Sequence, residues 1–246
     1  MKKIFIVVPV LAMVLLSAIS CSKGTTSPSA TPTPNATMPP LLVDDFEAGN
    51  TFNAMGGGWY TYGDTAFGGS NAAPAGMVFA SGDTVTAVHS LEISGSSTIS
   101  TNIAHPPTGG YYGFIGACTT FTAMNLSAYK GIRFYAKTYY QPTSANDKMN
   151  VWVASQYEVT HNVQSHYRAQ LDAPLGNTWY YYEIPWSAFT QDYVYDSNYP
   201  SHPRTRSQVL QDAVMVGFDK EYVYASTGLP PSSWSQMMFV DDVELY

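Results

Sequence analysis

One residue pattern, apolar side chains next to pairs of carboxylates, occurs twice in the sequence. It is found in Val43-Asp44-Asp45-Phe46-Glu47 and again in Val240-Asp241-Asp242-Val243-Glu244. Both runs have the length and composition of a strand, and we interpret them as the first and last strands of one domain. If they lie side by side, their carboxylates crowd one sheet edge and repel unless a cation or water separates them. Hard oxygen ligands suit calcium, so the edge is predicted to be a calcium site or a solvated rim. The candidate ligands are Asp45, Glu47, Asp241 and Asp242.

A second group of polar side chains lies on one predicted strand, residues 166–172. Alternation places apolar residues on one face of this strand and hydrogen-bonding residues on the other. The hydrogen-bonding residues are His166, Arg168, Gln170 and Asp172. Long polar side chains opposite an apolar face suit a polar ligand, and they suit a solvated outer face equally well.

The elements that would position these side chains are short strands separated by Gly and Pro turns. Predicted strands cover residues 77–80, 89–93, 98–103, 131–138, 149–154, 166–172, 178–185, 212–219 and 237–245. Along 131–138, alternation predicts that Ile132, Phe134 and Ala136 face the core and that Lys137 faces outward. We find no amphipathic helix pattern. The sequence therefore predicts an all-β domain, a two-sheet β-sandwich.

An ordered set of motifs across residues 41–246 resembles a known family. The motifs are Asp44-Asp45-Phe46-Glu47, Gly58-Trp59, Leu126-Ser127 to Phe134, Trp179 to Phe189, and Phe239-Val240-Asp241-Asp242. They resemble the family-11 carbohydrate-binding modules and the related galactose-binding-like jelly rolls, which include the intermediate-associated-protein-30 domain. The resemblance implies a jelly roll whose concave face holds β-1,4 and mixed β-1,3-1,4 glucans, with a structural calcium ion.

The resemblance also implies individual ligand-binding residues. Its aromatic platforms correspond to Tyr62 and Tyr111, and its aspartates and tyrosines elsewhere correspond to Asp192, Tyr193 and Asp212. The family's arginine before Asp192 is absent, and Arg168 is a candidate to replace its guanidinium. A pyranose ring has an apolar face and a rim of hydroxyls, so aromatic plates flanked by carboxylates and amides satisfy both. The alternative is that Tyr62 and Tyr111 are core aromatics.

Composition narrows the function classes. Of 246 residues only 12% are charged while 14% are aromatic, including 19 tyrosines, and the formal net charge is -7. No basic cluster is available to neutralise phosphates, so nucleic acid is excluded as an expected partner. An uncharged surface rich in tyrosine is typical of sugar binding.

The N-terminal 40 residues have the features of an export leader and a linker. Residues 1–20 combine Lys2 and Lys3 with an apolar run, which predicts a signal peptide. The run Ala18-Ile19-Ser20-Cys21 resembles the lipobox of bacterial lipoproteins, although Ala18 replaces the usual leucine, and implies a lipid anchor on Cys21. A disulfide between Cys21 and Cys118 is the alternative, and otherwise Cys118 is expected to be a buried small hydrophobe. Residues 21–40 are predicted to be a flexible tether. We therefore expect the protein at the bacterial outer membrane or cell surface.

Three functions are compatible with these features. The first is non-catalytic binding of a polysaccharide, most simply a β-glucan, beside separate glycoside hydrolases. The second is a jelly-roll glycoside hydrolase, which needs two carboxyls about 5 to 10 Å apart, with Glu158 and Glu183 as candidates. The third is a structural or assembly partner that binds protein through the tyrosine-rich residues 193–199.

Overall fold

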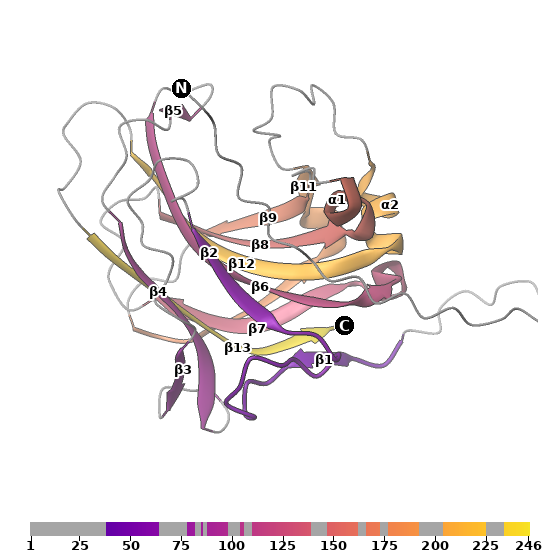
Figure 1. Cartoon of the computed structure of the whole chain (residues 1–246), viewed down its shortest axis with the longest axis horizontal. Helices are drawn as coiled ribbons and strands as arrows, with labels where there is room; N and C mark the ends of the chain where they lie inside the picture. The colour runs from indigo at the N-terminus through magenta and orange to yellow at the C-terminus, as the bar shows by residue number, and fades with distance from the viewer. Residues whose placement is uncertain are drawn as a thin grey trace, which may run out of the picture. The chain divides into compact units, whose positions relative to one another are not determined.

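The two-sheet architecture is seen in a computed structural model of the chain (Figure 1). It describes residues 38–63, 78–81, 85, 88–97, 104–105, 110–138, 147–161, 166–172, 177–191, 204–224 and 234–246. The predicted signal peptide, Cys21 and nearly all of the tether lie outside these residues, as does the predicted strand 98–103. The described residues belong to the compact unit Thr37–Tyr246.

The described strands form two antiparallel sheets. The first sheet has the order β10 (Tyr180–Pro185), β7 (Gly131–Thr138), β13 (Trp234–Leu245), β4 (His89–Ser97) and β3 (Val78–Ser81), with β1 (Leu41–Asp44) paired to β13. The second sheet has the order β11 (Thr190–Gln191), β9 (Tyr167–Asp172), β8 (Asp147–Ser155), β12 (Ala213–Tyr224), β6 (Gly110–Met124) and β2 (Trp59–Gly63), with β5 (Ala104–His105) paired to β6. Successive strands such as β6, β7 and β8 alternate between the sheets, as in a jelly roll. The predicted all-β sandwich is confirmed.

The core lies between the two sheets and is rich in aromatic rings. Phe218 of β12 contacts Phe134 of β7 at a centroid distance of 4.9 Å, and Trp59 at 6.2 Å. On β7 the predicted inward residues Ile132, Phe134 and Ala136 are all fully buried. Period-two alternation therefore identified the core side of this strand correctly.

The two Val-Asp-Asp runs are neighbours, as predicted. β1 pairs antiparallel with β13, and Leu41 lies opposite Leu245. The pairing is irregular at the acidic residues, where Phe46 and Asp242 adopt positive φ angles of 60° and 49°. The chain therefore bends at each run, and the carboxylates do not form one regular row.

The described residues also contain short helices, which were not predicted. Within these residues there are two six-residue helices, α1 (Gln156–His161) and α2 (Arg206–Gln211), together with the 3-10 turns η2 (Leu126–Ala128) and η3 (Trp186–Ala188). Six residues are too few to show an amphipathic period, but α2 has a local signal, a capping box between Thr205 and Gln208. None of the helices in the described ranges is long and apolar enough to cross a membrane.

Candidate functional site

The outer face of the second sheet carries two aromatic rings that lie directly on its backbone. Gly217 of β12 is paired with Trp152 of β8, and a Cβ atom at Gly217 would lie 2.2 Å from the indole ring. Gly116 of β6 has the same relation to Tyr62 of β2, because a Cβ atom at Gly116 would lie 2.3 Å from Cζ of that ring. Glycine inside a strand permits this close approach. We call these two rings, Trp152 over Gly217 and Tyr62 over Gly116, the aromatic floor of the face.

A chain of hydrogen bonds holds these rings in place. Trp152 Nε1 donates to the Tyr62 hydroxyl at 2.7 Å, and that hydroxyl donates to Asp219 Oδ2 at 3.1 Å. Asn150 Nδ2 donates to the other carboxylate oxygen of Asp219 at 2.6 Å. Burial and the neighbouring Asp219 carboxylate raise the pKa of Tyr62, so its hydroxyl keeps its proton. Asn150 is fully buried, and its Oδ1 has no hydrogen-bond partner within the described part of the chain.

Next to this network, the face has an accessible region. Tyr60 of β2 is 41% exposed, and its hydroxyl donates to Met215 Sδ at 3.8 Å. On the far strands, Lys148 forms an ion pair with Asp172 at 2.6 Å, and Gln170 is exposed. Three strands, β6, β12 and β8, separate Tyr60 in β2 from Gln170 and Asp172 in β9, so the face has an exposed ring toward one edge and exposed polar groups toward the other. Such a face is suited to an extended ligand that is apolar on one side and hydroxylated on its rim.

Cys118 is the cross-strand partner of Tyr60, and its thiol is expected to be unreactive. Its thiol is free and 2% exposed, and burial raises its pKa to about 12. The thiolate needed for nucleophilic attack is therefore scarce at neutral pH. This agrees with the expected role of a small buried hydrophobe.

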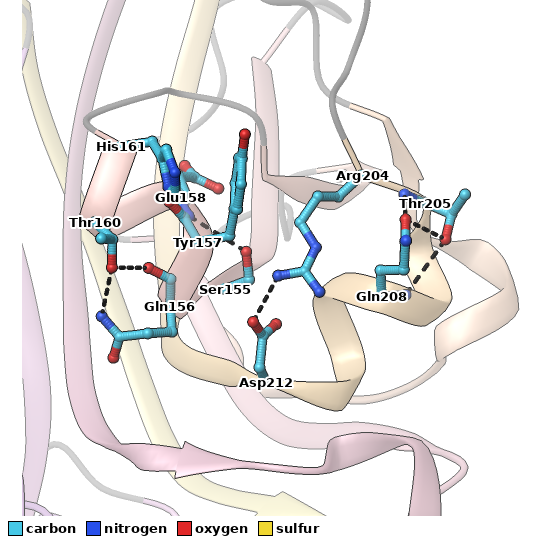
Figure 2. A network of polar contacts seen from close by, with 10 residues as sticks. All are labelled: Ser155, Gln156, Tyr157, Glu158, Thr160, His161, Arg204, Thr205, Gln208 and Asp212. Carbon is cyan, nitrogen blue, oxygen red and sulfur yellow. Dashed lines mark hydrogen bonds and ion pairs between the residues drawn. The ribbon is translucent and has the colours of Figure 1, made fainter.

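A polar network at one end of the second sheet joins α1 to the residues around α2. Figure 2 shows the Arg204 guanidinium directed at the Asp212 carboxylate, with the ring of Tyr157 beside it. The guanidinium carbon lies 5.4 Å from the centre of that ring. Glu158 Oε1 lies 3.2 Å from His166 Nδ1, and the His166 ring lies 4.9 Å from that of Trp152. His166 therefore connects this network to the aromatic floor.

The structure brings several of the predicted ligand-binding residues to one sheet. Tyr62, His166, Arg168 and Gln170 all lie on or beside it, with Arg168 paired to Trp152 and Gln170 to Asn150. Asp212 lies after α2, paired with Arg204. The backbone of Tyr111 lies in β6, opposite Ala104 and Tyr224, whereas Asp192 and Tyr193 lie outside the described residues.

Sequence reasoning missed four residues of this face. They are Tyr60, Asn150, Trp152 and Asp219. A signal was present, because Lys148, Asn150 and Trp152 alternate with Met149, Val151 and Val153 in one strand. Glycines inside the neighbouring strands, at 116 and 217, also indicate a position where another group approaches the backbone.

Three of the four predicted calcium ligands, Asp45, Glu47 and Asp241, accept hydrogen bonds from backbone amides, and the fourth, Asp242, directly follows Asp241. Asp45 Oδ1 accepts from the amide of Glu47, and Glu47 accepts from Val88 and His89, which lowers the pKa of Glu47. Asp241 is fully buried and accepts from Val85 and Asp242. Burial, with added repulsion from Asp242 and Glu47, raises the pKa of Asp241 to about 6.

No group of three or more acidic, His or Cys side chains is arranged to hold a metal among the residues that the structure describes. The repulsion between Asp241, Asp242 and Glu47 is nevertheless what a bound cation would relieve. Calcium therefore stays a prediction of the sequence.

Removal of calcium gives a direct test. If a calcium ion joins these carboxylates, adding about 100 times its Kd to the EDTA-treated protein stabilises the fold by about 2.7 kcal/mol. We expect a higher Tm with calcium than with EDTA, and we expect Asp242→Asn to reduce the difference. The measurement is thermal unfolding followed by circular dichroism. Identical Tm values with calcium and with EDTA would contradict a structural calcium ion.

Comparisons with known proteins find similarity in structure alone. No protein-family model matches the sequence, and no curated protein matches it. A solved family 11 carbohydrate-binding module from a cellulosomal cellulase of Clostridium thermocellum is 17% identical, over 85% of this chain and 95% of that chain, with a TM-score of 0.48. A family 11 module from the same organism, in complex with a β-1,3-1,4-mixed-linked tetrasaccharide, is 18% identical over 84% and 94% of the two chains, also with a TM-score of 0.48. Both belong to the family whose motifs the sequence resembles.

Proposed function

We propose that this protein binds a neutral polysaccharide, without catalysis, on the outer face of its second sheet. The observation that carries the proposal is the hydrogen-bonded chain from Trp152 through Tyr62 and Asp219 to Asn150. Trp152 and Tyr62 belong to a second, smaller cluster with Cys118 and Ala154, separate from the main core between the sheets. Rigid rings and pre-oriented polar groups reduce the entropy cost of holding a sugar chain.

The expected ligand is a β-glucan, either β-1,4 or mixed β-1,3-1,4 linked. Its flat pyranose rings expose C–H groups that suit the exposed ring of Tyr60. Its hydroxyls suit exposed amides such as that of Gln170, which can both donate and accept hydrogen bonds. A phosphate backbone is a less suitable ligand for this face, because the buried carboxylate of Asp219 lies at its centre and repels anions.

Affinity electrophoresis through gels containing lichenan, barley β-glucan, xyloglucan or xylan tests the proposal. We expect at least one polysaccharide to retard the protein, and we expect Tyr60→Ala to weaken the interaction about tenfold, or by about 1.4 kcal/mol. Tyr180→Ala is the matched control, because Tyr180 is similarly exposed at 44% but lies in the first sheet. Equal retardation of the wild type and of both variants would show that Tyr60 is not in the site. No retardation on any gel would overturn the proposal.

Glycoside hydrolysis is the weaker alternative. Glu158 lies in α1, beside the second sheet, where it contacts His166, whereas Glu183 lies in β10 of the first sheet and is exposed. One candidate carboxyl therefore lies in a helix beside the second sheet and the other in a strand of the first sheet, so they do not form a pair across one face. Release of reducing sugar from the same four polysaccharides would favour the enzyme. Capture of a protein through residues 193–199, with no glycan bound, would instead favour an assembly role.

We further propose that Cys21 carries a lipid that tethers the domain to the bacterial outer membrane or cell surface. Support comes from the apolar leader and the run Ala18-Ile19-Ser20-Cys21. In a bacterial host, we expect the wild type in the membrane fraction and Cys21→Ser in the soluble fraction. Cys118→Ser, which changes a buried thiol of the domain, is the control and should stay with the membrane. An unchanged distribution of Cys21→Ser would contradict the lipid anchor. Separate glycoside hydrolases acting on the bound polysaccharide are the expected functional partners.

A further inference from the structure

A pair of tyrosines lies on the outer face of the first sheet, on the other layer of the sandwich from the proposed glycan face. Tyr135 of β7 and Tyr181 of β10 are direct cross-strand partners, with ring centroids 5.2 Å apart and a tilt of 53°. Their neighbours Phe134 and Tyr182 stack against each other on the core side of the same strands. Tyr135 and Tyr181 therefore point away from the core, and Tyr181 is 49% exposed.

Polar contacts hold the exposed ring of Tyr181 in one orientation. Its hydroxyl donates to Glu183 Oε2 at 3.0 Å and also forms a hydrogen bond with Arg133. Burial, followed by the interaction with Glu183, raises the pKa of Tyr181. A ring that is already ordered loses little conformational entropy when a ligand stacks on it. This exposed tyrosine is thus prepared for contact with a ligand.

The charged groups around the pair are one guanidinium and two carboxylates. Arg133 Nε donates to Glu244 Oε2 at 2.7 Å, and both side chains remain about one-third exposed. Together with Glu183, they place carboxylate acceptors and guanidinium donors at the edge of the two rings. A neutral ligand with many hydroxyls can use both kinds of group, whereas a polyanion would meet two carboxylates. This chemistry matches a pyranose chain.

We propose that Tyr135 and Tyr181 form a second contact site for a neutral polysaccharide, separate from the outer face of the second sheet. The ligand class rests on the proposed function, but the location follows from the first sheet alone. Two rings cover only one or two sugar units, so this site is weak for short oligosaccharides. It increases the affinity for long chains, because a polymer that is bound at one face has a raised effective concentration of its other segments at the second site.

The test compares neighbouring tyrosines on barley β-glucan. Tyr181→Ala removes the exposed ring, and Tyr180→Ala is the matched control, because Tyr180 is 44% exposed but is paired with Ala136, on the core side of β7. We expect Tyr181→Ala to weaken retardation by the polymer about threefold while Tyr180→Ala changes it little. Tyr181→Phe keeps the ring and should retain most of the binding. Thermal unfolding checks that the variants fold, with Tm values within about 4 °C of the wild type.

Combining Tyr181→Ala with Tyr60→Ala distinguishes failure of the second site from failure of the proposed binding on the second sheet. In Tyr60→Ala, we expect residual retardation that Tyr181→Ala then removes. Wild-type binding that Tyr60→Ala weakens and Tyr181→Ala leaves unchanged would overturn the second site and leave the proposed function intact. Binding lost in Tyr181→Ala but unchanged in Tyr60→Ala would support the first-sheet site and overturn the assignment of the second-sheet face. No retardation of the wild type by barley β-glucan would overturn the second site on this ligand.

Discussion

Replacing Gly217 with alanine is expected to weaken the proposed polysaccharide binding about tenfold and to destabilise the fold by about 1–3 kcal/mol. The new Cβ atom would lie 2.2 Å from the Trp152 ring, so the indole has to leave its position on β12. That movement breaks the hydrogen bond from Trp152 Nε1 to Tyr62 and releases the far end of the network. Urea unfolding measures the stability, and affinity electrophoresis measures the binding.

A double-mutant cycle identifies the clash as the cause. In a Trp152→Ala background the ring is absent, and we expect Gly217→Ala to cost much less stability than it does in the wild type. The difference between the two costs is the energy of the contact between residue 217 and the indole. If Gly217→Ala is equally destabilising in both backgrounds, the glycine is needed for the backbone of β12 and the proposed role of the ring is wrong.

Replacing Asp44 with alanine is expected to cost about 2–5 kcal/mol, because two buried donors lose their acceptor. Asp44 is 4% exposed and accepts from Trp59 Nε1 and from the amide of Phe46, both at 2.7 Å. These bonds hold the turn at Phe46, whose φ angle is positive, against the ring of Trp59. For a domain of this size the loss corresponds to a fall in Tm of about 5–15 °C, measured by calorimetry.

Asp45 provides the matched control for Asp44. It is the next residue and has the same side chain, but it is only partly buried and accepts one amide hydrogen bond, at 3.1 Å. We expect Asp45→Ala to cost less than about 1 kcal/mol in calcium-free buffer. Equal losses for the two variants would mean that the buried bonds of Asp44 do not determine the stability of this corner.

Local alternation predicted strands well because it depends on residues close together in the sequence. The bounds of 131–138 match β7, and the three residues predicted to face the core are fully buried. Lys137 shows the limit of the method. It lies on the outer side as predicted, yet it is 1% exposed, with its ammonium 4.9 Å from the Trp179 ring and 4.6 Å from that of Phe239. These rings come from distant parts of the sequence, so no local pattern predicts this cover.

The candidate site was predictable in part for the same reason. The polar side of 166–172 was visible from alternation, and the strand β9 carries it as expected. The aromatic floor could not be predicted, because the Trp152 ring fits on the sheet only where residue 217, more than sixty residues later, is a glycine. Tyr62 depends in the same way on Gly116, in a strand that becomes its neighbour only after folding. Such pairings of a ring with a glycine are long-range information.

The position of β13 imposes an order on folding. This strand joins β1, β4 and β7 in the first sheet, and it spans residues 234–245. Until those residues have been synthesised, β4 and β7 have no strand between them, and β1 has no partner in the sheet. Their apolar sides stay exposed to water and to other chains during that interval. Contacts of such high sequence separation make folding slow, so this domain is expected to need protection from aggregation until residue 245 has emerged from the ribosome.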